Sequence, residues 1–169
     1  KDPSAHNYIF IATGTGIAPF RSMLGDLTRL GMPSRVDLIM GSPYESDLLY
    51  DDELRELAED YPNRFFYRTA ISRHRVPNQN GMYYVQGRIL EDASVLTEIL
   101  KSDRTLIYIC GIAGMELGVF QSLAAILDPA SLAQYLTIDP EIRADPKAWE
   151  RKMISRQIKH TKRLFLEVY

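Results

Sequence analysis

The sequence contains very little cysteine and histidine. Among its 169 residues there is one cysteine, Cys110, and there are three histidines, His6, His74 and His160. A single cysteine cannot form an intramolecular disulfide, and three scattered histidines do not have the spacing of a zinc site. We therefore expect a reducing compartment and no metal site.

An excess of one charge and long apolar runs are also lacking. The 20 Lys and Arg residues are balanced by 22 Asp and Glu residues, which argues against a general nucleic-acid binder because such proteins need an excess of basic side chains. No run approaches the about 18 apolar residues of a membrane span, and residues 1–7 have neither an initiator Met nor a signal-peptide core. We expect a piece of a longer protein or a mature chain, in the cytoplasm or an organelle stroma.

Short apolar runs alternate with amphipathic segments along the chain. This alternation predicts an α/β fold, with a doubly wound, mostly parallel five-stranded sheet and helices on both faces. We expect a single domain over residues 1–169, with a probable insertion or irregular segment at 128–146, where there are three prolines. The expected strands are 8–12, 36–40, 65–71, 106–110 and 163–169, and the expected helices are 19–30, 51–58, 93–101, 115–127 and 147–160.

Three glycine or proline residues follow the first expected strand. Gly14, Gly16 and Pro19 come where the strand turns into a helix, so backbone amides and the helix dipole can face a diphosphate. The pattern departs from the usual dinucleotide fingerprint because Pro19 replaces its third glycine. No acidic residue ends the second strand, where an NAD site places its ribose ligand, so a plain NAD site is disfavoured.

Polar and aromatic residues follow the third strand. Ser72, Arg73 and Arg75 offer a hydroxyl and two guanidinium groups, and Tyr83 and Tyr84 follow with aromatic faces that can stack on adenine. Together they could recognise a 2′-phosphate. The alternative is a solvated basic loop beside a core pair formed by Tyr83 and Tyr84.

The ends of the last two strands carry further candidates. Cys110 and Gly111 end the fourth strand, where Gly111 would allow a ligand to approach closely; the alternative is that Cys110 is only a small buried apolar residue. Tyr169 ends the chain and would lie in the ligand crevice if the last strand reaches it; otherwise it is an ordinary exposed residue.

Seven segments together resemble the pyridine-nucleotide half of the ferredoxin–NADP reductase family. They occur in the family's order over nearly the whole chain, and residues 128–146 fit least well. The segments are KDP at 1–3, IATGTGIAPFRS at 11–22, LLY at 48–50, AISR at 70–73, YVQ at 84–86, CGIAGME at 110–116 and EVY at 167–169.

The resemblance implies roles for these residues in binding NADP(H). By the family's pattern, the diphosphate is cradled by Gly14, Thr15, Gly16 and Pro19. The 2′-phosphate is held by Ser72 and Arg73, and adenine stacks on Tyr84 with Gln86 nearby. The nicotinamide is bordered by Cys110, Gly111, Met115 and Glu116, and Glu167 and Tyr169 lie near the flavin.

The resemblance also implies cofactors and partners. Family members have an upstream FAD-binding domain and pass electrons between NADP(H) and ferredoxin or flavodoxin; the implied activity is hydride transfer between NADP(H) and FAD, and this chain alone lacks the FAD domain. Plant-type members have a lysine where this chain has Met82. Arg75 could replace that charge; without it, use of NAD becomes plausible.

Three other functions remain open from the sequence. One is a non-catalytic NADP(H)-binding sensor, which has no use for Glu167 and Tyr169. Another is the NADH-using reductase component of an oxygenase. The third is a flavodoxin-like FMN carrier, whose hydroxyl-rich phosphate loop differs from the glycine-proline loop of this chain.

Overall fold

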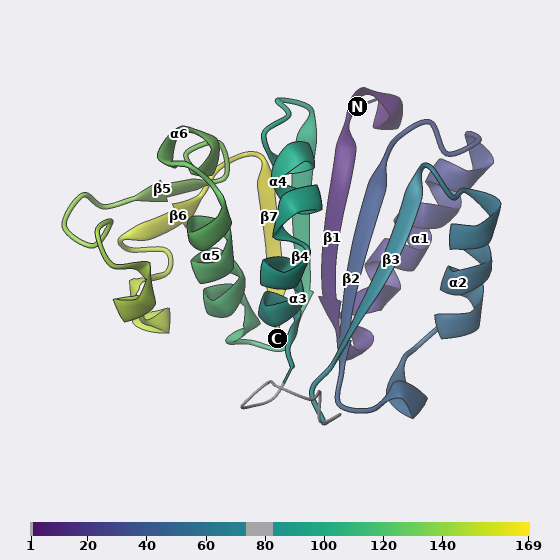
Figure 1. Cartoon of the computed structure of the whole chain (residues 1–169), viewed down its shortest axis with the longest axis horizontal. Coiled ribbons are helices and arrows are strands. Elements are labelled where there is room, and N and C mark those ends of the chain that lie inside the picture. The colour runs from purple at the N-terminus through teal and green to yellow at the C-terminus, as the bar shows by residue number, and fades with distance from the viewer. Residues whose placement is uncertain (1, 74–82) are drawn as a thin grey trace.

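The computed structural model describes residues 2–73 and 83–169, and its centre is a parallel β-sheet (Figure 1). Five strands form this sheet in the order β3-β2-β1-β4-β7, and each neighbouring pair is parallel. The predicted fold class is confirmed. The strands are β1 (Asn7–Thr13), β2 (Val36–Ser42), β3 (Phe65–Ile71), β4 (Thr105–Gly111) and β7 (Leu164–Val168).

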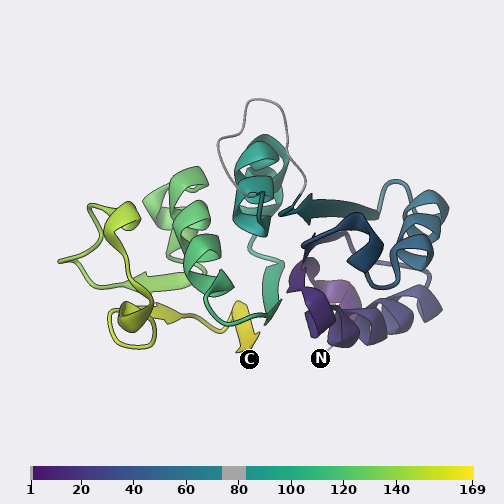
Figure 2. The same cartoon turned by 90° about the horizontal axis from the view of Figure 1, so that it is seen from below.

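Helices cover both faces of the sheet because the strands are apolar on both sides (Figure 2). On β1, Phe10 packs in the core cluster with residues of the first two helices, whereas Ile9 and Ile11 pack in the cluster on the other face. The ring of Phe10 stacks on that of Phe20 at 4.7 Å. One face carries α1 (Ile17–Arg29) and α2 (Asp51–Asp60), and the other carries α3 (Val85–Glu91), α4 (Ala93–Leu100) and α5 (Met115–Ile126).

A small lobe lies beyond α5, at the left of Figure 1. It contains α6 (Pro129–Leu132) and an antiparallel pair formed by β5 (Leu136–Ile138) and β6 (Ile158–His160). Residues 128–146 therefore include regular elements that pack against the core. Short 3₁₀ turns complete the chain: η1 (Pro3–Ala5), η2 (Gly14–Gly16), η3 (Glu45–Asp47), η4 (Pro146–Ala148) and η5 (Arg151–Met153).

The helix expected over residues 147–160 is wrong. This stretch holds η4, η5 and β6 instead. The buried Trp149 donates from its indole Nε1 to the Ile142 carbonyl at 2.8 Å, and Ser155 has a φ of +69°, which no helix interior accommodates. Charge periodicity suggested a helix, but burial of one aromatic side chain and pairing with β5 determine the structure here.

Helix α3 was not predicted from the sequence. It is only 7 residues long and contains Gly87, so propensity and periodicity are both weak. Its buried side chains, Val85 and Ile89, are one turn apart and pack into the core cluster of the face that carries α5. Tertiary packing therefore stabilises a helix that the local sequence does not specify.

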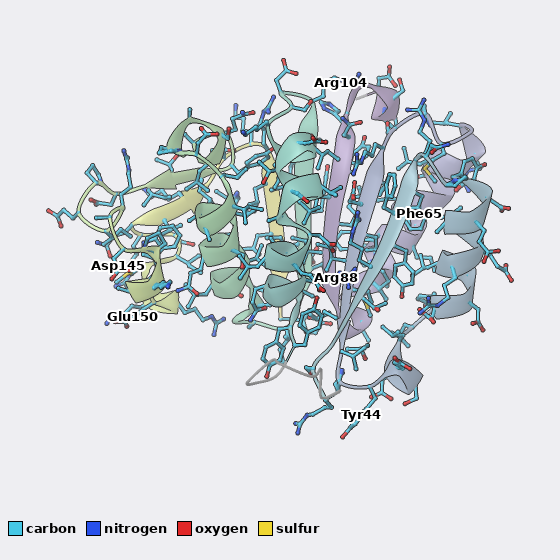
Figure 3. All side chains as sticks on the ribbon, in the orientation of Figure 1. Tyr44, Phe65, Arg88, Arg104, Asp145 and Glu150 are labelled. Atoms are coloured by element: carbon cyan, nitrogen blue, oxygen red, sulfur yellow. The ribbon has the colours of Figure 1, made fainter. Side chains whose placement is uncertain are left out.

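A buried carboxylate connects the sheet to α3 and α4. Asp37 on β2 is fully buried, and its oxygens accept hydrogen bonds from Arg35 Nε at 2.8 Å and Arg68 Nη1 at 2.6 Å. Arg68 also lies 3.3 Å from Asp92 between α3 and α4, and Asp92 pairs in turn with Arg88 at 2.6 Å. Arg88 is labelled on α3 in Figure 3. These ion pairs hold the end of α3 to strands β2 and β3.

Substituting Asp37→Asn should lower the free energy of unfolding by about 3 kcal/mol, because two arginines would lose their buried charged partner. Urea denaturation followed by circular dichroism measures this change. The matched control is Asp26→Asn, which breaks the exposed pair with Arg29 and should change stability little. Equal effects of both substitutions would contradict a structural role for the buried carboxylate.

Candidate functional site

The glycine loop after β1 packs tightly on one side and is open on the other. Gly14 has a φ of +53°, and a Cβ at this position would meet nothing within 4 Å. Gly16 is buried, and a Cβ there would lie 2.2 Å from the Cys110 carbonyl oxygen. Only glycine at position 16 therefore lets the loop lie directly on the end of β4.

Pro19 is the third residue of α1 and is exposed. Proline is tolerated in the first turn because the amides there have no partner within the helix. The amides of Gly14 and Thr15 precede this turn, and both residues are exposed. The loop thus presents backbone donors and the positive end of a 13-residue helix on the same side.

The carboxyl ends of the strands lie at the lower edge of the sheet in Figure 1. Residues that follow these ends line a pocket of about 780 Å³. Parallel strands bring these ends to one edge, and the winding direction reverses between β1 and β4. The pocket is lined by Thr13, Gly14, Thr15, Gly41, Ser42, Pro43, Ala70, Ser72, Tyr84, Val85, Gln86, Ile112, Ala113, Gly114, Met115 and Tyr169.

Seven residues predicted for the site line this pocket. They are Gly14, Thr15, Ser72, Tyr84, Gln86, Met115 and Tyr169. Seven others lie near it without lining it: Gly16, Pro19, Arg73, Cys110, Gly111, Glu116 and Glu167. Arg75 and Met82 lie outside the described residues.

The end of β3 carries the predicted 2′-phosphate residues. The Ser72 amide donates to the Ser42 carbonyl at 2.9 Å, and the Arg73 amide donates to the Pro43 carbonyl at 2.9 Å. These hydrogen bonds extend the pairing of β2 and β3 beyond the ends of the two strands. The exposed Arg73 therefore lies next to Ser72 and Pro43, which line the pocket. The Ser42 hydroxyl is buried and has no hydrogen-bond partner in the described part of the chain.

Tyr83 and Tyr84 differ in their surroundings. Tyr83 is buried and its hydroxyl donates to Glu91; burial, followed by this hydrogen bond, raises the pKa of Tyr83 to about 12. Tyr84 is 44% exposed and lines the pocket just before α3. The idea that both tyrosines form a core pair is therefore wrong for Tyr84. Gln86 follows on α3, and a Cβ at Gly118 on α5 would lie within 3.0 Å of its side chain.

The end of β4 requires glycine. Gly111 has a φ of +154°, and a Cβ there would lie 2.1 Å from Thr13 Oγ1. That hydroxyl accepts from the Ile112 amide at 2.9 Å and donates to Met115 Sδ at 3.3 Å. The Thr13 side chain at the end of β1 thus holds the loop that leads into α5.

Glu116 is buried in the first turn of α5 and has two partners. One carboxylate oxygen accepts from the Gly114 amide at 2.6 Å, and the other accepts from Arg151 Nε at 3.0 Å. Gly114 has a φ of +104° and lines the pocket. Arg151 was not predicted for the site, because only the folded chain brings the η5 turn next to α5.

Cys110 packs on the α1 side of the sheet, in the core cluster that includes Ala12, and not in the pocket wall. Burial, and to a lesser extent the Glu167 carboxylate, raises the pKa of the Cys110 thiol. A raised pKa keeps the thiol protonated at neutral pH, so it is a poor nucleophile. Glu167 is the register partner of Cys110 on the neighbouring β7 strand and is exposed.

The backbone of Tyr169 is held by hydrogen bonds, whereas its side chain is exposed. Its amide donates to the Gly111 carbonyl at 3.0 Å, and its carbonyl oxygen accepts from the Ala113 amide at 2.9 Å. The side chain is 63% exposed, lines the pocket and shares a 2.5 Å hydrogen bond with the Thr15 hydroxyl. The ring therefore borders the glycine loop.

Two other features are absent from residues 2–73 and 83–169. No group of three or more His, Cys, Asp or Glu side chains there could hold a metal ion. Within the same residues, no helix is both long and apolar enough to cross a membrane.

Comparison with known proteins identifies the family. The model of the family described as "Oxidoreductase NAD-binding domain" matches residues 10–120. A ferredoxin–NADP reductase of Thermosynechococcus vestitus is 38% identical over 129 residues, which are 73% of this chain and 33% of that protein. The chloroplastic leaf isozyme 1 of Arabidopsis thaliana is 39% identical over 127 residues, or 70% of this chain and 34% of the relative.

A root-type chloroplastic isozyme of Nicotiana tabacum matches more of the chain, with 32% identity over 166 residues, which are 96% of this chain and 40% of the relative. The chain thus spans about a third to two fifths of the length of these curated relatives. The family model covers the glycine loop, the ends of β1 to β4 and most of α5, the elements that build most of the pocket. The chain therefore belongs to the oxidoreductase NAD-binding domain family, and the relatives that it resembles are named ferredoxin–NADP reductases.

Proposed function

We propose that this chain binds NADP(H) along the carboxyl edge of its sheet and presents the nicotinamide to an FAD held mainly by an upstream domain. The complete protein would transfer hydride between NADP(H) and FAD and exchange single electrons with ferredoxin or flavodoxin, in the cytoplasm or a plastid stroma. The observation that carries the proposal is the single pocket that extends from the end of β3 to Tyr169 after β7.

The length of the pocket suits a dinucleotide. Five strands spaced about 4.8 Å apart place the end of β7 roughly 19 Å from the end of β3. An extended dinucleotide can span such a distance with its diphosphate over β1, where the glycine loop lies. This placement puts the adenosine near β3 and the nicotinamide near β4 and β7.

The adenosine end would be recognised by charge and stacking. The Arg73 guanidinium and the Ser72 hydroxyl can bind a 2′-phosphate, and the exposed Tyr84 ring can stack on adenine. The buried Ser42 hydroxyl, which lacks a partner among the described residues, could gain one from a bound nucleotide. A 2′-phosphate site favours NADP(H) over NAD(H).

The diphosphate would bind at the glycine loop. Gly14 and Thr15 are exposed there, and the empty space beside Gly14 leaves room for a phosphate. The positive end of the α1 dipole lies at this loop, so it can stabilise the negative charge.

The other end of the pocket would orient the nicotinamide. When bound, this ring supplies the hydride chemistry, and the protein provides placement. Met115 gives an apolar wall there, and Tyr169 borders the same space. Gly111 leaves room for the Thr13 side chain, which holds the loop before α5 in place. Cys110 and Glu167 lie on adjacent strands next to this end, where an FAD domain would bring the flavin.

The proposal is tested by nucleotide binding to the isolated chain. Isothermal titration should give micromolar affinity for 2′,5′-ADP, and the purified protein should be colourless and inactive in NADPH-dependent dye reduction. Joining the FAD domain of a relative should restore dye reduction. Tight retention of flavin by the chain alone, or no binding of 2′,5′-ADP, would overturn the proposal. A pure sensor predicts no activity in the fusion.

Arg73→Gln should weaken binding of 2′,5′-ADP by about tenfold, because one charge-assisted hydrogen bond to the phosphate is lost. Binding of 5′-ADP, which lacks the 2′-phosphate, should change little. Arg64→Gln is the matched control, since Arg64 is exposed and does not line the pocket. Equal loss for both ligands would refute a 2′-phosphate role and favour an NADH-using reductase.

Gly111→Ala should lower the free energy of unfolding by about 3 kcal/mol, because alanine is strained at this φ and its Cβ would clash with Thr13. Nucleotide affinity should fall as well. Thermal melting and titration measure the two effects. Gly25→Ala in α1, where a Cβ meets nothing within 4 Å, should instead stabilise by about 0.5–1 kcal/mol. An unchanged affinity in Gly111→Ala would place the ligand elsewhere.

Arg151→Gln should weaken nucleotide binding by about 1 kcal/mol, or roughly fivefold, because the Glu116 carboxylate would then repel the phosphates without a counter-charge. The double substitution with Glu116→Gln should recover most of the affinity. Lys152→Gln is the control, since Lys152 pairs with the exposed Glu150. Failure of the double substitution to recover affinity would argue against an electrostatic cause.

A further inference from the structure

We propose that a second, smaller pocket in the lobe beyond α5 binds a small apolar monocarboxylate, whose charge pairs with Arg143. This pocket has a volume of about 170 Å³ and lies between α5, α6, β5 and the η4 turn. It shares no lining residue with the nucleotide pocket. The family model ends at residue 120, so it does not cover this lobe.

The floor of this pocket is apolar and buried. It is formed by the side chains of Leu127, Leu132, Leu136, Ile138 and Trp149, each less than a tenth exposed. The pocket opens to solvent at its mouth, where Arg143 and Ala133 are exposed, so water can contact these apolar side chains when no ligand is bound. An apolar ligand would displace this water and remove apolar surface from solvent.

The mouth of the pocket carries one positive charge. Arg143 is exposed, lines the pocket, and donates from Nη2 to the Ile138 carbonyl at 3.0 Å. No carboxylate in the described part of the chain pairs with it. The rest of its guanidinium is therefore available to a ligand carboxylate, which it can bind in a fork.

Three acidic residues of the lobe accept hydrogen bonds from backbone amides instead of pairing with Arg143. Asp128 accepts from the Ala130 and Ser131 amides at the start of α6, Asp139 accepts from the Glu141 amide, and Asp145 accepts from the Lys147 amide. Figure 3 labels Asp145 at the outer end of the lobe. None of these carboxylates forms an ion pair with Arg143, although acidic residues are close to it in the sequence.

The volume limits the size of the ligand. An apolar cavity of about 150 Å³ admits one benzene-sized ring, so a pocket of 170 Å³ accepts a six-membered ring or a short aliphatic chain. A carboxylate attached to such a group would reach the mouth while its apolar part fills the floor. Cyclohexanecarboxylate has this form and does not absorb where tryptophan is excited.

The two pockets lie at opposite ends of α5. Met115 begins the helix in the nucleotide pocket, and Ala124 near its end lines the second pocket. Nine residues at about 1.5 Å each separate the two positions by roughly 14 Å. Binding in the lobe therefore does not require the nucleotide site, and the proposal does not depend on the proposed redox function.

Trp149 is the only tryptophan of the chain and lines the pocket, so its fluorescence reports binding directly. Titration of the 169-residue chain with cyclohexanecarboxylate should give a saturable change in tryptophan emission. The neutral analogue cyclohexanecarboxamide should bind at least about tenfold more weakly, because it lacks the charge that pairs with Arg143. Saturating 2′,5′-ADP should leave the titration unchanged.

Two substitutions and one control complete the experiment. Arg143→Gln should weaken carboxylate binding at least about tenfold, and Ala133→Leu should block the mouth, where Ala133 is exposed. Arg156→Gln is the matched control, since Arg156 is an exposed arginine of the same lobe that does not line the pocket. Thermal melting of each variant verifies folding.

Any of three results would overturn the proposal. These are no saturable signal with the carboxylate, the same affinity in Arg143→Gln as in Arg156→Gln, or competition by 2′,5′-ADP. If Arg143→Gln fails to fold, the comparison of the carboxylate with its amide in the unsubstituted chain decides the role of the charge. None of these results bears on whether the nucleotide pocket binds NADP(H).

Discussion

The contact between the glycine loop after β1 and the end of β4 is the constraint on which the site depends. The backbone at Gly16 lies directly on the carbonyl of Cys110, and Gly111 leaves room for the Thr13 side chain. A side chain at either glycine would separate the two strand ends at the place where the winding of the sheet reverses. Because both loops are held this close, the start of α1 and the start of α5 face the same pocket.

Charge is distributed along the pocket in a way that matches the proposed ligand. Arg73 lies at the β3 end, and the helix dipole of α1 acts at the centre. At the β4 end, the negative charge of Glu116 is compensated by Arg151. The net charge of −2 does not indicate this anion-binding arrangement. Anion binding depends on where the charged groups lie and not on the total charge.

The lobe beyond α5 contributes to the site although it lies outside the family model. Its Arg151 supports the Gly114 loop through Glu116, and its own apolar pocket lies at the opposite end of the same helix. One helix therefore connects the nucleotide pocket, which the family model covers in large part, with the pocket of the lobe, which it does not cover. The lobe packs on the core through Trp149, Leu132 and Ile138, which join the larger core cluster.

The sequence by itself determined the α/β fold class, the five strands of the parallel sheet and the family. Strand 65–71 was predicted with the observed bounds, because it is rich in aromatic and β-branched residues and is followed by a polar stretch that predicts a loop. Only the tertiary structure decided the short helix α3, the irregular turns at 147–160 and the contact between Arg151 and Glu116. Each of these depends on partners distant in the chain, whose packing outweighs the weak local preferences. Periodicity reports which face of a segment is apolar, but not which distant residue will cover it.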